Sequence, residues 1–534
     1  MQKEFQSEYI PYKQTGKFTS IVLDYISGAS SLKEFYDNPV SLEGIKQAID
    51  ARKNYPTDRK LLVAGLQHQY KGISDAESVF SNISLLADEN TFTVCTAHQP
   101  NIFTGHLYFI YKILHTVKFC ADLKTKLPQY NFVPVFFMGS EDADLAELNH
   151  IVVDQKRYEW KTIQTGAVGR MKVDKSLIQL IDDLSGRLSI EKYGQEIIEP
   201  IRECYQINFS IEHATFLFVH HLFKAFGVVV FLPDTAIFKK PMISLFEQDL
   251  FSHIPSEIVN RTSEELSKSY DAQAMPREIN LFYLSEGIRN RIIQKDEKFT
   301  VHQTELVFSK DELLAELHTH PERFSPNVIL RGLMQEIILP DIAFVGGGGE
   351  LAYWLQLKSL FTNFSVPFPV LILRNSFLII EKKYHELLQK LNLKNINLFN
   401  DQEKVFESIV RENSDHELNL SKEKGELASI YNSIQQRVKQ VDATLQQHTA
   451  ALEKKQQNLL TALEKKMLRA EKKKFVARKN QLEKVFSELF PDGGLQERSE
   501  NFTTYYAKWG PSFFDVIYEF SLTLEQEFCI LTES

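Results

Sequence analysis

The chain has 534 residues, of which 43% are hydrophobic and 12% aromatic, so it is long enough for two or three structural units with a substantial core. A formal net charge of −9 argues against nucleic acid as the main partner, and the four scattered cysteines exclude a disulfide framework. The N-terminus lacks the apolar core of a signal peptide, and no apolar run approaches a membrane span. We therefore expect a soluble, cytoplasmic protein without nucleic-acid or membrane partners.

Residues 1–90 indicate a mostly helical lead-in, and the first candidate ligand site follows at Thr93–Lys112. A short β-type run leads through a polar loop into a helix that we expect to begin near Gly105. A loop at the carboxyl end of a strand in an open α/β sheet is a usual position for a ligand. The alternative is that its polar side chains only cap the helix or fill a pocket. These side chains are His98, Gln99, Asn101, Thr104 and His106.

A second predicted strand, Phe132–Met138, runs directly into an acidic loop that contains Glu141, Asp142 and Asp144. Acidic residues in a first helical turn stabilise the helix dipole, which is the simplest explanation. Because like charges repel, the cluster otherwise needs a divalent metal, a substrate ammonium group or a nearby Lys or Arg. Another strand is expected at His150–Val153, and these spacings predict a parallel, doubly wound sheet.

The rest of the predicted core alternates with less regular segments. Residues 155–225 are charged and helical in pattern, and residues 243–325 are expected to form an insertion beside the sheet. Further core strands are expected at Gly227–Leu232, at the start of Phe324–Arg331, at Ile342–Val345 and at Pro369–Arg374.

Four glycines and Glu350 follow the strand at Ile342–Val345. Glycines here would let a ligand approach the backbone closely, although a tight turn explains them equally well. The loop lacks the Gly-Lys-Ser/Thr of a phosphate loop, and Glu350 suits an amino group better than a bare phosphate. Arg331 and Arg374 could bind carboxylates or form structural ion pairs.

The composition changes near residue 415, and Ser421–Leu489 has the apolar spacing of a coiled coil. We expect this segment to form a homodimer, with an intramolecular hairpin as the alternative. The polar break at Lys454–Asn458 is either a stutter or the tip of that hairpin. The expected domains are therefore a core at 1–415, a coiled coil at 416–489 and a tail at 490–534 that packs back on the core.

Five groups of residues together point to one family, and they occur in its order over nearly the whole chain. They are His98-Gln99 with Phe103–Tyr108 and Tyr111-Lys112; Pro134-Val135 with Gly139–Asp142, Asp144, Glu147 and Asn149-His150; Ser325–Val328 with Arg331; Ala343–Gly347 with Gly349–Trp354; and Phe490–Arg498. They resemble the bacillithiol biosynthesis cysteine-adding enzymes, the cysteine ligase family BshC. This chain departs from the family at three places: the family more often has Gly-Gln-Gln at Ala97-His98-Gln99, often has proline where His106 stands, and often has histidine where Ala143 stands.

The resemblance implies a Rossmann-like core with inserted segments and a coiled coil. It also implies a ligase that joins the carboxyl group of L-cysteine to the amine of glucosaminyl malate, the last step of bacillithiol synthesis. Amide formation in water needs an activated carboxyl, so ATP or another donor is expected, but the sequence does not identify it. The alternative is a non-catalytic, Rossmann-like scaffold that binds a nucleotide or thiol and dimerises through its coiled coil.

The expected site combines these loops without a metal ion. We assign catalytic roles to Glu141, Asp142 and His150. In a working model, Glu141, Asp142 and Glu350 hold ammonium groups or, alternatively, a metal. Thr104, Gly105 and the helix that follows hold an anionic group, and Asn327 and Arg331 position malate or the cysteine carboxylate. The residues expected to bind substrate are His98, Gln99, Thr104, Gly105, Tyr108, Lys112, Asn327, Arg331, Gly347, Gly349, Glu350, Trp354 and Arg374.

Overall fold

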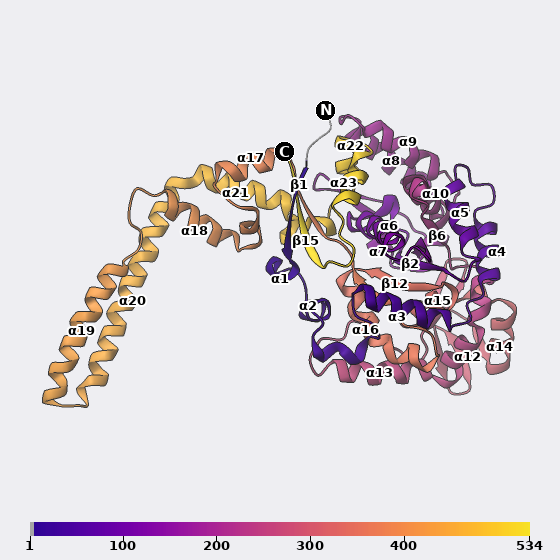
Figure 1. Ribbon diagram of the computed structural model, residues 1–534, viewed down its shortest axis with the longest axis horizontal. Coiled ribbons are helices and arrows are strands. Elements are labelled where there is room, and N and C mark those ends of the chain that lie inside the picture. Colours follow the sequence, from indigo (N-terminus) through magenta and orange to yellow (C-terminus); the bar gives the residue numbers. More distant parts are fainter. Residues whose placement is uncertain (1–4) are drawn as a thin grey trace. The chain divides into compact units, whose positions relative to one another are not determined.

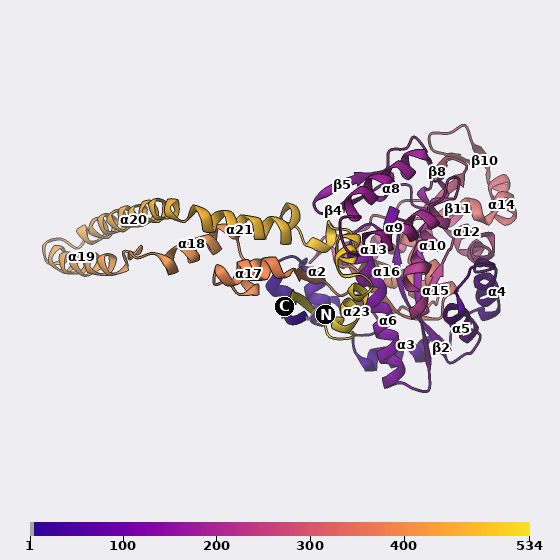
Figure 2. The same cartoon turned by 90° about the horizontal axis from the view of Figure 1, so that it is seen from above.

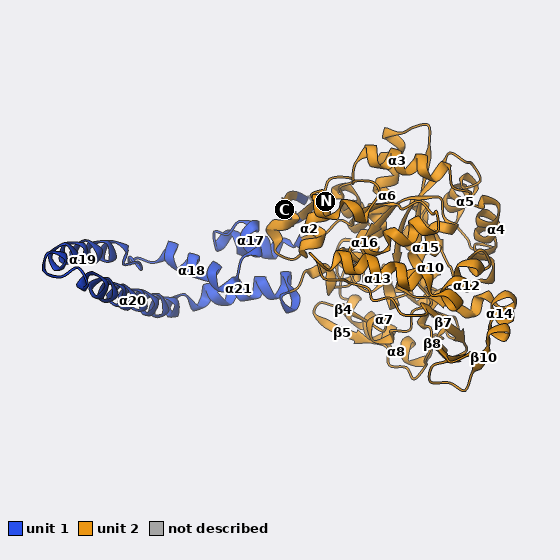
Figure 3. Ribbon diagram, turned by 90° about the horizontal axis from the view of Figure 1, so that it is seen from below, with its two compact units in different colours: residues 1–6, 379–493, 530–534 blue, residues 7–378, 494–529 orange. Residues whose placement is uncertain are grey.

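The computed structural model describes residues 5–534, and they form two compact units (Figure 3). We call residues 7–378 and 494–529 the core unit, and residues 379–493, with residues 5–6 and 530–534, the helical unit. The unit boundaries fall within three strands, β1 (Phe5–Pro11), β14 (Phe377–Ile380) and β15 (Glu527–Glu533). The division therefore comes earlier in the chain than the change of composition near residue 415.

A five-stranded parallel sheet forms the centre of the core unit (Figure 1). Its spatial order is β13-β12-β2-β3-β6, which is 3-2-1-4-5 in reverse when the strands are numbered along the chain. This is the order of the first five strands of a doubly wound Rossmann sheet, so the predicted fold class is confirmed. The strands are β2 (Thr91–His98), β3 (Asn131–Met138), β6 (Val229–Phe231), β12 (Asp341–Gly346) and β13 (Val370–Leu373).

The strands of this sheet are rich in apolar and β-branched residues and are buried along nearly their whole length. Every residue of β12 and β13 is buried, and so are most residues of β2 and β3, as expected where helices cover a parallel sheet. Helices α3 (Leu42–Lys53) and α6 (Tyr108–Lys126) share one apolar cluster with the strands. Helix α6 starts at Tyr108, three residues later than expected.

Two predicted strands exist but lie outside the parallel sheet. Strand β4 (His150–Val153) pairs antiparallel with β5 (Lys156–Glu159), because only Asp154 and Gln155 separate them and both adopt positive φ, as a tight hairpin turn requires. Strand β11 (Phe324–Pro326) is the edge of an antiparallel sheet with the order β10-β9-β8-β7-β11. The other members are β7 (Leu281–Ser285), β8 (Ile288–Lys295), β9 (Lys298–Val301) and β10 (Val307–Ser309).

The remaining helices of the core unit surround these sheets (Figure 2). The lead-in and the first inserted segment contain α1 (Tyr12–Thr15), α2 (Ser20–Ile26), α4 (Arg59–Gln69), α5 (Glu77–Leu85), α7 (Leu145–Leu148), α8 (Lys175–Leu188), α9 (Gly194–Cys204) and α10 (Ile211–Phe223). The later ones are α11 (Ala236–Lys239), α12 (Ile243–Ser252), α13 (Ile254–Leu266), α14 (Lys310–Thr319), α15 (Val328–Ile338), α16 (Gly348–Asn363), α22 (Thr503–Trp509) and α23 (Ser512–Phe520).

The helical unit contains a long antiparallel hairpin (Figure 1). Its arms, α19 (Ser421–Val441) and α20 (Leu445–Lys472), are joined by an ion pair between Lys424 and Glu464 and by a hydrogen bond from Gln435 Nε2 to Glu453 Oε2 (3.3 Å). The tip is at 442–444, where the Asp442 carboxylate accepts a hydrogen bond from Thr444 N (2.8 Å). The break at Lys454–Asn458 is therefore not the tip but part of a continuous helix. The unit also contains α17 (Lys382–Lys390), α18 (Gln402–Asn413) and α21 (Val476–Leu489).

None of the helices in residues 5–534 combines the length and apolar composition needed to cross a lipid bilayer.

Candidate active site

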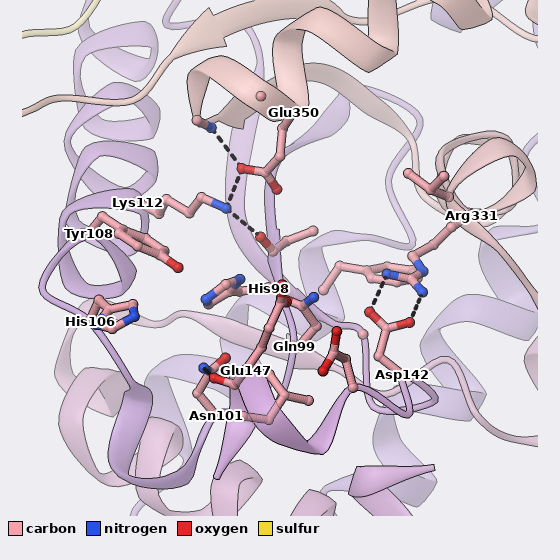
Figure 4. A pocket seen from close by; sticks show the side chains of 18 of the residues that line it. His98, Gln99, Asn101, His106, Tyr108, Lys112, Asp142, Glu147, Arg331 and Glu350 are labelled. Atoms are coloured by element: carbon pink, nitrogen blue, oxygen red, sulfur yellow. Dashed lines mark hydrogen bonds and ion pairs between the residues drawn. The ribbon is translucent and has the colours of Figure 1, made fainter. Parts of the chain in front are cut away.

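A cavity of about 880 Å³ opens at the carboxyl ends of β2, β3 and β12 (Figure 4). It lies beside the point where the sheet order reverses, between β2 and β12, which is the general ligand position in open α/β sheets. Its lining comes from distant parts of the core unit. Besides the three strand-end loops, it includes α6, β7, β8, α15, α16, the residue after β13 and a segment after the helical unit.

Most of the residues that the sequence assigned to the site line this cavity. They are His98, Gln99, Tyr108, Lys112, Asp142, His150, Asn327, Arg331, Gly347, Gly349, Glu350 and Arg374. Glu141, Thr104, Gly105 and Trp354 do not line it. The lining describes a position and not a role, so the assigned catalytic and binding functions stay predictions.

Asp142 is held by two arginines on the cavity wall. Arg331 binds it through both terminal nitrogens, with Nη1 3.1 Å from Oδ2, and Arg289 Nη2 lies 3.4 Å from Oδ1. Burial raises the pKa of the Asp142 carboxyl, but the two guanidinium groups outweigh that effect and hold the pKa below its ordinary value. Asp142 is therefore a carboxylate whose charge orients two arginines.

Glu141 points away from the cavity into the protein. Its carboxylate forms an ion pair with Lys239, which is fully buried and also lies 2.8 Å from Asp234. Arg170 completes the network with Nε 2.7 Å from Asp234 Oδ2. The cations that neutralise the acidic cluster are thus protein side chains. Glu141 anchors the acidic loop to the interior through its ion pair with Lys239.

On the opposite wall, the buried Lys112 forms an ion pair with the partly exposed Glu350. Lys112 Nζ also donates to Ala97 O (2.8 Å), and Glu350 Oε2 accepts from Gly347 N (2.7 Å). The pair therefore ties α6 to the end of β2 and to the start of α16. A ligand amino group would have to compete with Lys112 for Glu350.

Arg374 supplies a fixed positive charge next to that pair. Its Nη2 donates to Glu497 Oε1 (2.7 Å), and its guanidinium carbon lies 5.1 Å from the centre of the Tyr108 ring. The side chain is buried, yet its Nε has no hydrogen-bond partner among residues 5–534. A buried donor without a partner beside a cavity is suited to bind an anionic ligand group.

The loop between β2 and α6 is strained. Phe103, Thr104 and Gly105 have φ values of 49°, 70° and 66°, and the first two carry side chains that disfavour this region. Asn501 stabilises the loop, because its Nδ2 donates to Phe103 O (3.0 Å) and to Gly105 O. Thr104 and Gly105 thus turn the chain toward α6 instead of facing the cavity.

Trp354 and Asn327 are largely committed to the protein itself. Trp354 is buried and stacks on Phe344 with ring centres 4.5 Å apart. Asn327 lines the cavity, but its Oδ1 accepts from Ile329 N (2.8 Å) at the start of α15 and its Nδ2 donates to Asn280 (3.0 Å). Its first structural role is therefore to cap a helix.

Several charged lining residues were not among those expected to bind substrate, although Asp144 belongs to the acidic cluster recognised in the sequence. Asp144 and Glu147 are exposed carboxylates at the rim, and Arg498 is an exposed cation there. Arg289 comes from β8 and packs over Phe282 at 4.1 Å. No sequence pattern near Arg289 indicated that it belongs to the site. Asp144, Glu147 and Arg498, in contrast, all lie in the segments that carried the family resemblance.

The cavity thus offers carboxylates on one side of its rim and arginines on others, together with neutral imidazoles. Burial lowers the pKa of His98, His106 and His150, so each imidazole is neutral near pH 7. Such a surface suits a small ligand that carries both ammonium and carboxylate groups. Fold and cavity together define a Rossmann-like protein with a cavity at its switch point that is suited to small polar molecules.

The chain belongs to the bacillithiol biosynthesis BshC family. The family's N-terminal Rossmann-like domain matches residues 5–375, and its C-terminal coiled-coil domain matches residues 377–533. A relative from Flavobacterium johnsoniae is 36% identical over 531 residues and covers 98% of this chain and 99% of its own. A relative from Flavobacterium psychrophilum is 37% identical over 507 residues and covers 94% of this chain and 95% of its own. A relative from Salinibacter ruber is 31% identical over 518 residues and covers 95% of this chain and 94% of its own. All three are named "Putative cysteine ligase BshC", which confirms the resemblance seen in the sequence.

Proposed function

We propose that this protein joins the carboxyl group of L-cysteine to the amino group of glucosaminyl malate, the last step of bacillithiol synthesis in the cytoplasm. Membership of the BshC family and the names of the relatives support a cysteine ligase. The observation that carries the proposal is the cavity, in which Asp144 and Glu147 offer carboxylates and Arg374 and Arg498 offer cations. Cysteine is a zwitterion, and glucosaminyl malate carries an amine and two carboxylates, so both substrates need both signs of charge.

An amide bond does not form from a free carboxylate and an ammonium ion in water. The cysteine carboxyl must first be activated, so a co-substrate such as ATP is expected in the reaction mixture. The residues of the cavity would bind and orient the two substrates and remove a proton from the amine. Exclusion of water by the enclosed walls would protect the activated carboxyl from hydrolysis.

The deciding experiment deletes the gene in its host and measures low-molecular-weight thiols by mass spectrometry. We expect bacillithiol to disappear and glucosaminyl malate to accumulate, because the last step is blocked. The intact chain should restore the thiol, whereas Glu350→Gln should not, since it leaves the buried Lys112 without its counter-charge. Unchanged bacillithiol in the deletion strain would contradict the proposal and favour a non-catalytic scaffold.

We further propose that the protein is a homodimer through the hairpin of α19 and α20. Seven large apolar side chains of the hairpin are at least 40% exposed in a single chain, and monomers rarely leave so much apolar surface open. They are Ile430 (57%), Ile434 (40%), Val441 (82%), Leu445 (40%), Leu452 (41%), Leu459 (56%) and Leu463 (47%).

Multi-angle light scattering at micromolar concentration should give twice the mass of 61.8 kDa. The double variant Ile430→Lys/Leu459→Lys should give the monomer mass with an unchanged circular dichroism spectrum, because both side chains project from formed helices. A matched control, Gln447→Lys/Gln456→Lys, adds the same charge at exposed polar positions of α20 and should remain a dimer. A monomeric wild-type chain would refute this part of the proposal.

A further inference from the structure

Arg374 has one hydrogen-bond donor that the protein itself does not use. Its Nη1 donates to Asn375 O (3.0 Å) and Ser376 Oγ (3.1 Å), and its Nη2 donates to Glu497 Oε1 (2.7 Å). Its Nε has no hydrogen-bond partner among residues 5–534, although the residue is only 4% exposed and lines the cavity. A buried donor on a charged group raises the free energy of the protein while it stays unpaired, so a ligand acceptor at Nε would stabilise the site.

Glu497 fixes the direction in which that donor points. It is fully buried, and its carboxylate also accepts hydrogen bonds from Ser376 Oγ (3.1 Å) and Phe377 N (3.3 Å). The guanidinium is planar and rigid, so the bonds that hold Nη1 and Nη2 also set the orientation of the Nε–H bond. Burial lowers the pKa of Arg374, but the charge of Glu497 outweighs that effect and holds the pKa above its ordinary value.

The start of helix α16 lies beside the unused donor. Gly347, Gly348 and Gly349 line the cavity, and no side chain caps the helix. The first N–H groups of a helix have no intrahelical acceptor, so those of Gly348 and Gly349 can donate to a ligand. A methyl group on Gly347 would lie 3.7 Å from Arg374 Nε, which brings the side-chain donor and the helix start into one corner of the cavity.

The charges in this corner favour an anion with a single negative charge. The Glu497 carboxylate balances the charge of Arg374. Glu350, in the first turn of α16, balances Lys112 (Figure 4). Arg498 adds an exposed cation at the rim. A phosphate with two charges would be repelled by Glu350 at the same helix start, whereas a carboxylate brings one charge and two acceptor oxygens.

We propose that Arg374 Nε and the start of α16 form the subsite for a carboxylate of the malyl group, and that Glu497 is the positioning residue of this subsite. The inference rests on the proposed function, in which glucosaminyl malate is a substrate. The cysteine carboxyl has to meet the activating donor and then the amine, so it is not the group held in a fixed corner. The malyl carboxylates do not react, and holding one of them orients the reacting amine.

The other arginines of the cavity fit this role less well. Arg331 binds Asp142 through both terminal nitrogens, and Arg289 lies 3.4 Å from the same carboxylate. Their charge is therefore already shared with an acid of the cavity wall. Arg498 is exposed, so water screens its charge. Among the arginines that line the cavity, Arg374 combines burial, a fixed orientation and an unused donor.

The test measures binding and needs no turnover. The purified full-length chain is titrated by isothermal titration calorimetry with glucosaminyl malate and with its dimethyl ester, in which both malyl carboxylates are neutral. In Arg374→Gln/Glu497→Gln the two buried charges are removed together, so neither is left unpaired. We expect the wild type to bind the acid more tightly than the ester by about tenfold or more. The double variant should bind both with the affinity that the wild type has for the ester.

Two single variants separate the subsite from its support. Gly347→Ala adds a methyl group at ordinary contact distance from Arg374 Nε, so the fold should persist while the preference for the acid falls. Glu497→Gln keeps the arginine but loosens its orientation, so part of the preference should be lost. A full preference in Glu497→Gln would show that Glu497 does not position Arg374.

The control makes the same two changes in an exposed ion pair on α13. Arg261→Gln/Glu257→Gln should bind both ligands like the wild type. A wild type that binds acid and ester equally, or a double variant that still prefers the acid, would overturn the inference and leave the proposed function standing. A wild type that binds neither form would show that glucosaminyl malate is not a substrate, and the proposed function would fail together with the inference.

Discussion

Cells that depend on Asp142→Asn should make at least 100-fold less bacillithiol than cells with the wild-type chain. Both Arg331 and Arg289 contact the Asp142 carboxylate, so removal of its charge frees two cavity arginines at once. A displacement of about 1 Å in a positioning group can cost about 100-fold in rate. The readout is the ratio of bacillithiol to glucosaminyl malate by mass spectrometry, with Asp183→Asn on the exposed face of α8 as the matched control.

The same substitution should also lower stability by about 1–3 kcal/mol, because two guanidinium groups lose their counter-charge. The pKa of Asp142 is lowered in the folded protein, so its contribution is present above the unfolded pKa of about 3.9 and is lost as the pH falls through the folded value. The difference in melting temperature between wild type and Asp142→Asn should therefore be largest near neutral pH and shrink below about pH 4. Normal bacillithiol in the variant would contradict a role for this loop in the site.

Replacing Arg52 by Met should destabilise the core unit by about 3–5 kcal/mol, the usual cost of breaking a buried ion pair. The Arg52 guanidinium is buried and contacts Glu336 Oε2 (2.6 Å), Glu336 O (2.7 Å) and Asp341 O (2.9 Å). These contacts join α3 to the end of α15 and to the amino end of β12. Since that is the strand end opposite the cavity, the activity of each folded molecule should stay the same.

Urea unfolding followed by circular dichroism measures this effect as a lower midpoint. Lys46→Met on the same helix is the control, because Lys46 is half exposed and lies 3.6 Å from Glu43, so its loss should change stability by less than about 0.5 kcal/mol. Arg52→Met/Glu336→Gln should recover part of the loss, since it removes the unpaired buried carboxylate. A change below about 1 kcal/mol for Arg52→Met would show that the pair does not stabilise the fold.

The parallel sheet and the main loops of the cavity could be predicted from the sequence because the signals are local. Each strand is an apolar run, and polar residues such as Asp142 follow directly where the strand ends. The sequence could not show that Glu141 faces inward, because its partner Lys239 is 98 residues away in the chain. It also could not assign His150–Val153 to a hairpin instead of the parallel sheet, because a run of four mostly apolar residues is too short for its pattern to tell the two apart.

The hydrogen bonds from residues 499–501 to the loop before α6 have a consequence for how the protein is made. The loop at Phe103–Gly105 leaves the ribosome about 400 residues before the segment that stabilises it. At about 5–20 residues per second, that delay is roughly 20–80 s. During this time the nascent sheet can form, but its ligand cavity lacks the backbone partners of His106 and Leu107. A chain that terminates early is therefore released with an incomplete cavity.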